Sequence, residues 1–76
     1  MLFDEVREIL SNQLEISEDE ITPEAKLYDD LGAGDADMAD IGMTIEEQYC
    51  IEVTEEALEE MAIVADIVAF IEGNID

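Results

Sequence analysis

The sequence contains no histidine and no tryptophan, a single cysteine, and only two basic residues, Arg7 and Lys26. Without histidine, the commonest general base and metal ligand is missing, so neither an enzyme nor a metal centre is expected. The single Cys50 excludes an internal disulfide and fits a reducing compartment, where we expect a packed or unreactive thiol. No basic, apolar leader opens the chain, and no apolar run approaches the roughly 20 residues that span a bilayer. We therefore predict a cytoplasmic protein without membrane insertion.

Acidic residues dominate the composition. The chain has 23 aspartates and glutamates against two bases, which gives a formal charge of −21 at pH 7. This charge repels nucleic acid phosphates and attracts proteins with basic patches. Hydrophobic residues nevertheless make up 49% of the chain, which is enough apolar surface to offset the entropy lost on folding. We expect one folded domain, residues 1–76, that is a monomer and binds no nucleic acid.

The spacing of hydrophobic residues predicts four helices and no sheet, which is a small four-helix bundle of the all-α class. The first helix covers roughly residues 2–15, and its inward stripe consists of Phe3, Val6, Ile9, Leu10 and Leu14. The helical period is lost over residues 16–31, a long loop with a short turn at Thr22-Pro23-Glu24. The apolar residues expected to pin this loop to the core are Ile21, Ala25, Leu27 and Leu31.

The helical period resumes after Gly34. A second helix is predicted over about residues 36–49, with Asp35 as the residue that caps its N-terminus. Its inward stripe consists of Met38, Ile41, Gly42, Ile45 and Tyr49. Thr54 is expected to cap a short third helix that ends near Glu60. The last helix is marked by Val64, Ile67, Val68 and Ile71, and is expected to stop at Gly73 and Asn74.

One long segment carries a family pattern: LYDDLGAGDADMADIGMTIEEQYCIEVTEEALEEMAIVADIVAFI. The positions of the pattern are Asp30-Leu31-Gly32-Ala33, Asp37, Met43, Glu46-Glu47, Tyr49 and Phe70-Ile71. In these residues and in its first helix the chain resembles the acyl carrier proteins, without gaps and over nearly its whole length. The resemblance implies a phosphopantetheine carrier fold of four helices, with a long first loop and a short third helix.

The resemblance places Asp35 at the serine to which 4′-phosphopantetheine is attached in that family. A carboxylate cannot act as the attacking hydroxyl, so we expect no cofactor on the chain as written. Gly34 and Ala36 also depart from the aspartate and leucine that flank the family's serine. Three interpretations of Asp35 stay open: a helix cap, a mimic of the arm's phosphate, or an engineered change that keeps the chain unmodified. The other candidate attachment residues lie outside any such context: Ser11, Ser17, Thr44 and Cys50.

Gly42 also departs from the family, which favours a branched apolar residue at this inward position. Glycine inside a helix costs about 1 kcal/mol relative to alanine and leaves a gap in the core. Methionine fills irregular gaps well, so we expect Met38 and Met61 to occupy this space. The alternative is an apolar hollow beside Gly42.

The second helix is predicted to carry a docking face for other proteins. Charged residues surround one methionine on its outward side, and the candidate docking residues are Asp37, Asp40, Met43, Glu46 and Glu47. The resemblance implies that acyl-synthesis enzymes with basic patches dock there, whereas the simpler alternative is a solvated face. A calcium-loop pattern cannot be laid on Asp30 or Asp35, so only weak divalent binding is expected.

Two functions follow from these observations. The favoured one is an acyl carrier protein-like module of fatty acid or related acyl biosynthesis, which docks through its acidic second helix. Its covalent acyl carriage is in doubt because of Asp35. The alternative is an interaction or regulatory protein that keeps the carrier fold and holds no cargo.

Overall fold

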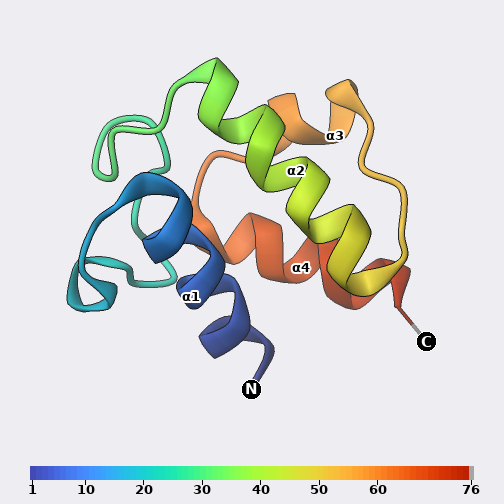
Figure 1. Ribbon diagram of the computed structural model, residues 1–76, viewed down its shortest axis with the longest axis horizontal. Helices are drawn as coiled ribbons and strands as arrows, with labels where there is room; N and C mark the ends of the chain where they lie inside the picture. Colours follow the sequence, from blue (N-terminus) through green and yellow to red (C-terminus); the bar gives the residue numbers. More distant parts are fainter. Residues whose placement is uncertain (76) are drawn as a thin grey trace.

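Four α-helices account for most of the chain in the computed structural model, which describes residues 1–75 (Figure 1). Their bounds, with one short 3₁₀ helix, are α1 (Leu2–Leu14), η1 (Glu18–Glu20), α2 (Asp35–Tyr49), α3 (Glu55–Glu60) and α4 (Val64–Asn74). The described residues contain no strand, only an isolated antiparallel bridge between Lys26 and Ile63. The predicted all-α bundle, with its short third helix, is confirmed.

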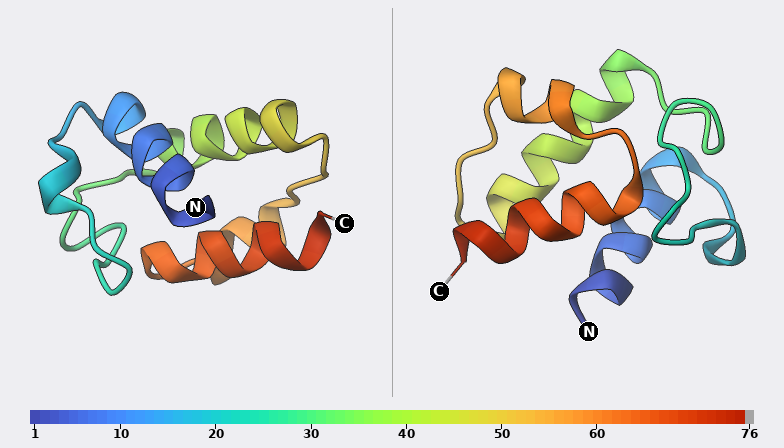
Figure 2. Two further views of the ribbon diagram at one scale, coloured as in Figure 1. Left: turned by 90° about the horizontal axis from the view of Figure 1, so that it is seen from below. Right: turned by 180° about the vertical axis from the view of Figure 1, so that it is seen from behind.

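The helices pack in two layers around one core. Helix α1 contacts both α2 and α4, and α3 contacts α2. Seen from below, α1 and α2 lie side by side over α4 (Figure 2). One-sided burial of each helix drives this arrangement, because apolar side chains every three or four residues make a continuous stripe. The largest fully buried side chains come from three helices and the loop: Val6, Leu10, Leu27, Ile41, Ile45, Val64, Ile67 and Ile71.

The long loop between α1 and α2 is fixed to the start of α4. Leu27 N–H donates to the carbonyl oxygen of Ala62 at 2.9 Å, and Val64 N–H donates to that of Ala25 at 3.0 Å. The four loop residues predicted to reach the core are all buried: Ile21, Ala25, Leu27 and Leu31. The loop therefore places the residues before α2 at a defined position. The 3₁₀ helix η1 was not predicted from the sequence.

Two helix ends test the predicted capping. Thr54 Oγ1 accepts the Ala57 N–H at 3.1 Å, so the predicted cap of α3 is confirmed. The predicted stop of α4 at Gly73 and Asn74 is confirmed, because the helix ends at Asn74. Asn74 Nδ2 donates to the carbonyl oxygen of Phe70 at 2.7 Å, and this bond satisfies an acceptor of the last turn. Glycine is tolerated there because the side chain of its neighbour completes the helix end.

Candidate functional site

The start of α2 forms the first part of the candidate site. Gly34 is the N-cap, with extended backbone angles of φ −104° and ψ 178°, and Asp35 is already the first residue of the helix. Asp37 Oδ2 accepts the Gly34 N–H at 3.0 Å. The prediction that Asp35 caps α2 is therefore wrong by one residue, because the carboxylate three positions after the cap reaches back instead. Asp35 still places its charge in the first turn, at the positive end of the helix dipole.

The chain enters α2 through a tight turn that other aspartates and a glycine organise. Asp30 Oδ2 accepts the Lys26 N–H at 2.8 Å and closes the turn. Gly32 has a φ of +72°, a left-handed conformation that side-chain-bearing residues rarely adopt. Leu31 and Ala33 are buried on either side of it and anchor the turn to the core. The aspartate-rich stretch is thus partly structural: Asp30 and Asp37 both bond to the backbone.

An open pocket of about 290 Å³ lies beside Asp35, between the loop, α2 and α3. Apolar side chains and three carboxylates line it, and the lining residues are Tyr28, Asp35, Met38, Ala39, Glu55, Leu58 and Glu59. None of these is a serine or threonine. The sequence did not predict that Tyr28, Glu55 and Glu59 line this pocket. Hydrophobic periodicity identifies the buried faces of helices, and it does not show that a loop residue and α3 lie close together.

The space beside Gly42 is filled by neighbouring side chains, as expected, but these are not the two methionines that were predicted. A Cβ at this position would lie 3.3 Å from both terminal methyls of Leu58 and 3.6 Å from Cγ1 of Val53. The prediction that Met38 and Met61 fill this gap is therefore wrong, although both are buried in the core. The missing side chain lets Leu58 of α3 come close to the α2 backbone.

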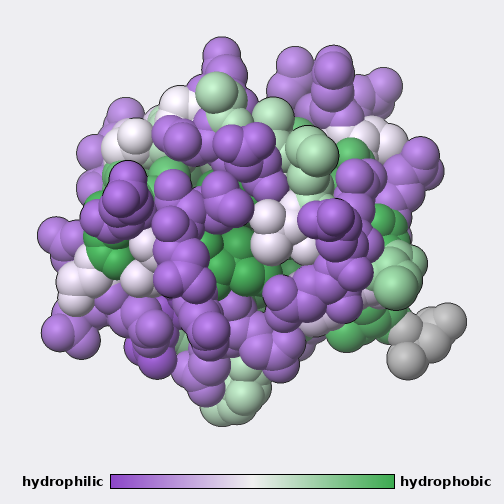
Figure 3. Space-filling view, viewed as in Figure 1, coloured by the Kyte–Doolittle hydropathy of each residue, from purple (hydrophilic) through white to green (hydrophobic). Residues whose placement is uncertain are grey.

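An exposed strip runs along α2. It consists of Asp40, Met43 and Glu47, and we call these three residues the α2 strip. They share one face because residues three and four positions apart are neighbours on a helix. Met43 is 60% exposed and lies between the two charged residues of the strip. The surrounding face is mostly hydrophilic (Figure 3).

The other two predicted docking residues have structural contacts. Asp37 caps α2, as described above, and is half-buried. Glu46 is also half-buried, and its Oε2 accepts the Val53 N–H at 2.8 Å. That bond fixes the connection between α2 and α3. Sequence periodicity places both residues on the outward side of α2, but it does not reveal backbone groups of neighbouring loops that they reach.

The end of α2 is tied to α1. The Tyr49 hydroxyl donates to Glu5 Oε1 at 2.7 Å. Burial, followed by this hydrogen bond and the charge of Glu5, raises the pKa of Tyr49 to about 12. Cys50 ends the helix in a left-handed conformation, with a φ of 57°. Its thiol is exposed, so of the two expected alternatives, a packed or an unreactive thiol, the packed one is wrong.

Within residues 1–75, no three or more acidic or cysteine side chains converge as metal ligands would. In the same range, none of the helices has the length and apolar character needed to cross a bilayer.

Comparison with known proteins identifies the family. A family model described as the phosphopantetheine attachment site matches residues 4–71. The chain belongs to the acyl carrier protein family. Its curated relatives include the acyl carrier protein of Wolinella succinogenes, 37% identical over 73 residues that cover 96% of each chain. Another is that of Thermotoga maritima, 41% identical over 74 residues that cover 97% of this chain and 91% of the relative.

A solved structure supports the same fold. The chain matches the solution structure of the apo doublet acyl carrier protein from prodigiosin biosynthesis with a TM-score of 0.84. The match covers 97% of this chain but 36% of the doublet, at 18% identity, so it bears on the fold alone. The acyl carrier proteins are carriers and not enzymes, and family membership therefore confirms the prediction that this chain is not an enzyme.

Proposed function

We propose that this chain is a docking module of fatty acid or related acyl biosynthesis that carries no phosphopantetheine arm at Asp35. It binds acyl-synthesis enzymes through the α2 strip. The observation that carries the first part is the carboxylate at the first residue of α2, beside a pocket whose lining contains no serine or threonine. Membership in the acyl carrier protein family supports the acyl-synthesis partners.

Attachment of the arm requires an alcohol oxygen that forms a phosphodiester. By its family resemblance Asp35 occupies the attachment position, and a carboxylate has no such alcohol. Ser11 Oγ donates to the carbonyl oxygen of Ile16 at 2.6 Å, and Thr44 Oγ1 donates to that of Asp40 at 3.0 Å. Ser17 and Thr54 accept backbone N–H groups at the starts of η1 and α3. The residue at the attachment position therefore does not fit the group.

The docking part of the proposal rests on the composition of the α2 strip. Met43 offers an exposed apolar side chain, and Asp40 and Glu47 place exposed charges three residues before it and four after it. An apolar anchor inside a charged rim is a common arrangement at protein interfaces, where the anchor gives affinity and the rim steers association. The net charge of −21 favours a basic partner surface.

Intact-mass spectrometry tests the attachment part. The purified chain is incubated with coenzyme A and a broad-specificity phosphopantetheinyl transferase, with a serine-bearing acyl carrier protein as the positive control. We expect the mass of this chain to stay unchanged. Asp35→Ser should restore only slow or partial modification, because Gly34 and Ala36 still differ from the family's flanking residues. A pantetheine adduct on the unaltered chain would refute the proposal, and fragmentation would locate the acceptor.

A cargo-free regulatory protein with the carrier fold is the second candidate function. The exposed Asp35 carboxylate at the start of α2 favours it, because a fixed negative charge there imitates a phosphorylated serine. Competition separates the two candidates. A regulatory mimic should displace a phosphopantetheine-bearing carrier from its enzyme, and Asp35→Asn should weaken this displacement. If Asp35→Asn competes as well as the original chain, the mimic is excluded.

A further inference from the structure

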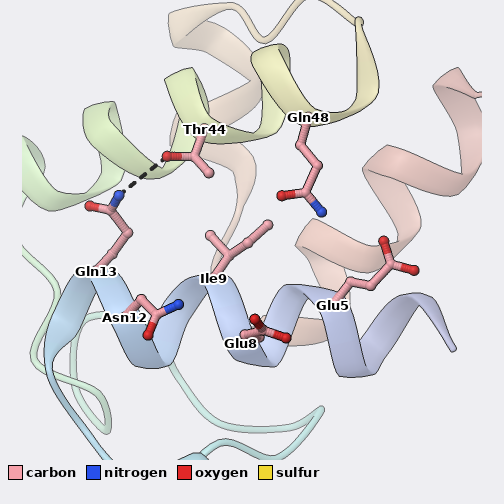
Figure 4. A pocket seen from close by; sticks show the side chains of 7 residues that line it. All are labelled: Glu5, Glu8, Ile9, Asn12, Gln13, Thr44 and Gln48. Carbon is pink, nitrogen blue, oxygen red and sulfur yellow. Dashed lines mark hydrogen bonds between the residues drawn. The ribbon is translucent and has the colours of Figure 1, made fainter.

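A groove separate from the α2 strip lies between α1 and α2, with a volume of about 270 Å³. Figure 4 shows its lining side chains, which come from both helices: Glu5, Glu8, Ile9, Asn12, Gln13, Thr44 and Gln48. Ile9 lies between the two helices among polar neighbours (Figure 4). On the face seen in Figure 3, a hydrophobic patch near the middle is surrounded by hydrophilic side chains. The groove thus combines an apolar floor with a polar rim.

The two ends of the groove are fixed by hydrogen bonds. Gln13 Nε2 donates to Thr44 Oγ1 at 3.2 Å and links the helices at one end (Figure 4). At the other end, Glu5 Oε1 accepts the Tyr49 hydroxyl, and Gln48 Nε2 donates to the same hydroxyl at 3.3 Å. The amide oxygen of Gln48 is thereby left on the side of the groove (Figure 4). The carboxylate of Glu5 and this amide oxygen are acceptors held in place before any partner arrives.

The carboxylates of the groove have no cation from the chain itself. Among residues 1–75, neither Glu5 nor Glu8 forms an ion pair. Arg7 lies on the same helix, but its guanidinium pairs with Asp4 at 3.3 Å and with Glu18 at 3.4 Å. It also lies 5.4 Å from the ring centre of Phe3. The one arginine of the sequence is therefore engaged elsewhere, and the charge of the groove is open to an outside cation.

We propose that this groove takes an arginine side chain from the surface of a basic partner protein. A guanidinium has five N–H donors in a planar fork, which suits a rim of carboxylate and amide oxygens. Its methylene stem can cover the apolar surface of Ile9 while the charge stays among the polar groups. Lysine is a poorer match, because its point charge offers fewer donors in a less fixed geometry.

The groove is a contact site in its own right, and it adjoins the α2 strip. Thr44 and Gln48 directly follow Met43 and Glu47 along α2, so they lie about 100° around the helix from them. A partner seated on the α2 strip can therefore extend an arginine into the groove. The inference does not depend on such seating, because the groove alone supplies the charge, the floor and the oriented acceptors.

Nuclear magnetic resonance with a defined probe tests the inference on the full chain. The isotope-labelled protein is titrated with a capped Ala-Arg-Ala peptide, and with Ala-Lys-Ala and Ala-citrulline-Ala peptides of the same length. We expect saturable shifts of the Ile9 methyls and of the Asn12 and Gln48 side-chain amides with the arginine peptide. The lysine peptide should bind more weakly, and the uncharged citrulline peptide should produce no saturable shift.

Matched variants separate the groove from general charge and from the α2 strip. Glu8→Gln should weaken binding of the arginine peptide by roughly two- to fivefold, which is the range expected for the loss of one exposed ion pair. Glu72→Gln on α4 and Asp40→Asn on the α2 strip remove the same charge elsewhere, and each should change affinity by less than about twofold. Absent shifts, or shifts spread evenly over the acidic surface with equal lysine and arginine affinity, would overturn the inference. Docking through the α2 strip would stand unaffected by that result.

Discussion

Asp37 accepts the Gly34 N–H at 3.0 Å, so a residue predicted to meet a partner also holds the start of α2 in place. We predict that Asp37→Lys loses this cap and places a positive charge at the wrong end of the helix dipole. The loss should be about 1 kcal/mol of unfolding free energy, measured by urea denaturation.

The matched control for Asp37 is Asp40→Lys. Both substitutions lower the negative charge of the chain by two, and therefore relieve the same general repulsion. The side chain of Asp40 is exposed, and the hydrogen bond to this residue goes to its backbone oxygen. Asp37→Lys should thus be the less stable of the two by about 1 kcal/mol. Equal stabilities would mean that the cap contributes nothing measurable.

Glu46 gives a second prediction of the same kind. Its carboxylate accepts the half-buried Val53 N–H, so Glu46→Ala leaves this donor without a protein partner. The unfolding free energy should fall by about 1 to 3 kcal/mol, whereas Glu47→Ala on the exposed face should stay within about 0.5 kcal/mol. Glu46→Gln keeps an acceptor oxygen and should recover most of the loss. If Glu46→Gln is as unstable as Glu46→Ala, the hydrogen bond is not the cause.

Sequence reasoning located the helices well and their end contacts poorly. Helices α1 and α2 lie within about one residue of their predicted bounds, because burial on one side repeats with every helical turn. The cap of α2 was misassigned because five aspartates occupy residues 29–40, and several of them could bond the first turn. The contacts of Gly42 with Leu58, and of Glu46 with Val53, depend on how α3 packs on α2. The groove between α1 and α2 depends on helix packing in the same way.

The pKa of Tyr49 leads to a prediction about alkaline stability. Its value of about 12 in the folded chain exceeds the ordinary value of 10.0, so the folded state holds the proton more tightly. The resulting stabilisation is fully present below pH 10 and is lost as the pH rises toward 12. The unfolding free energy of the original chain should therefore fall faster over this range than that of Tyr49→Phe. Parallel curves for the two proteins would contradict the raised pKa.

Spectroscopy examines the cause of the same shift. In a Tyr28→Phe background, phenolate absorbance reports on Tyr49 alone, since the chain contains two tyrosines. Glu5→Gln retains an oxygen that can accept the Tyr49 hydroxyl but removes the charge. In this variant we expect the titration midpoint of Tyr49 to move down toward 10. It should remain above 10, because burial is the larger cause of the raised pKa.

Ionic strength should affect the whole chain. Mutual repulsion among 23 acidic residues is screened by salt, which shortens the range of charge interactions to about 10 Å at 0.1 M. Between about 20 and 200 mM sodium chloride we expect the unfolding free energy to rise by about 1 kcal/mol, which raises the melting temperature by about 4 to 8 °C. Calorimetry at constant pH measures this change. A melting temperature that does not respond to salt would show that the repulsion costs little.

The last prediction concerns docking through the α2 strip, with a purified ketoacyl synthase as the probe. Asp40→Lys combined with Glu47→Lys should slow association about tenfold at low salt, because exposed complementary charges steer the encounter. The difference should shrink as salt rises. Glu24→Lys combined with Glu72→Lys is the control, since it changes the net charge equally at exposed positions outside the α2 strip and the groove.

Met43→Ala should change the dissociation rate rather than the association rate. Met43 is exposed and apolar, so its loss should raise the dissociation rate, by about tenfold if it is an anchor, with little dependence on salt. Surface plasmon resonance measures both rates for each variant. If the control pair slows association as much as the α2 strip pair, and Met43→Ala dissociates like the original chain, binding follows net charge alone. The α2 strip is then a solvated surface, because a true contact face requires that position as well as charge determine the rate.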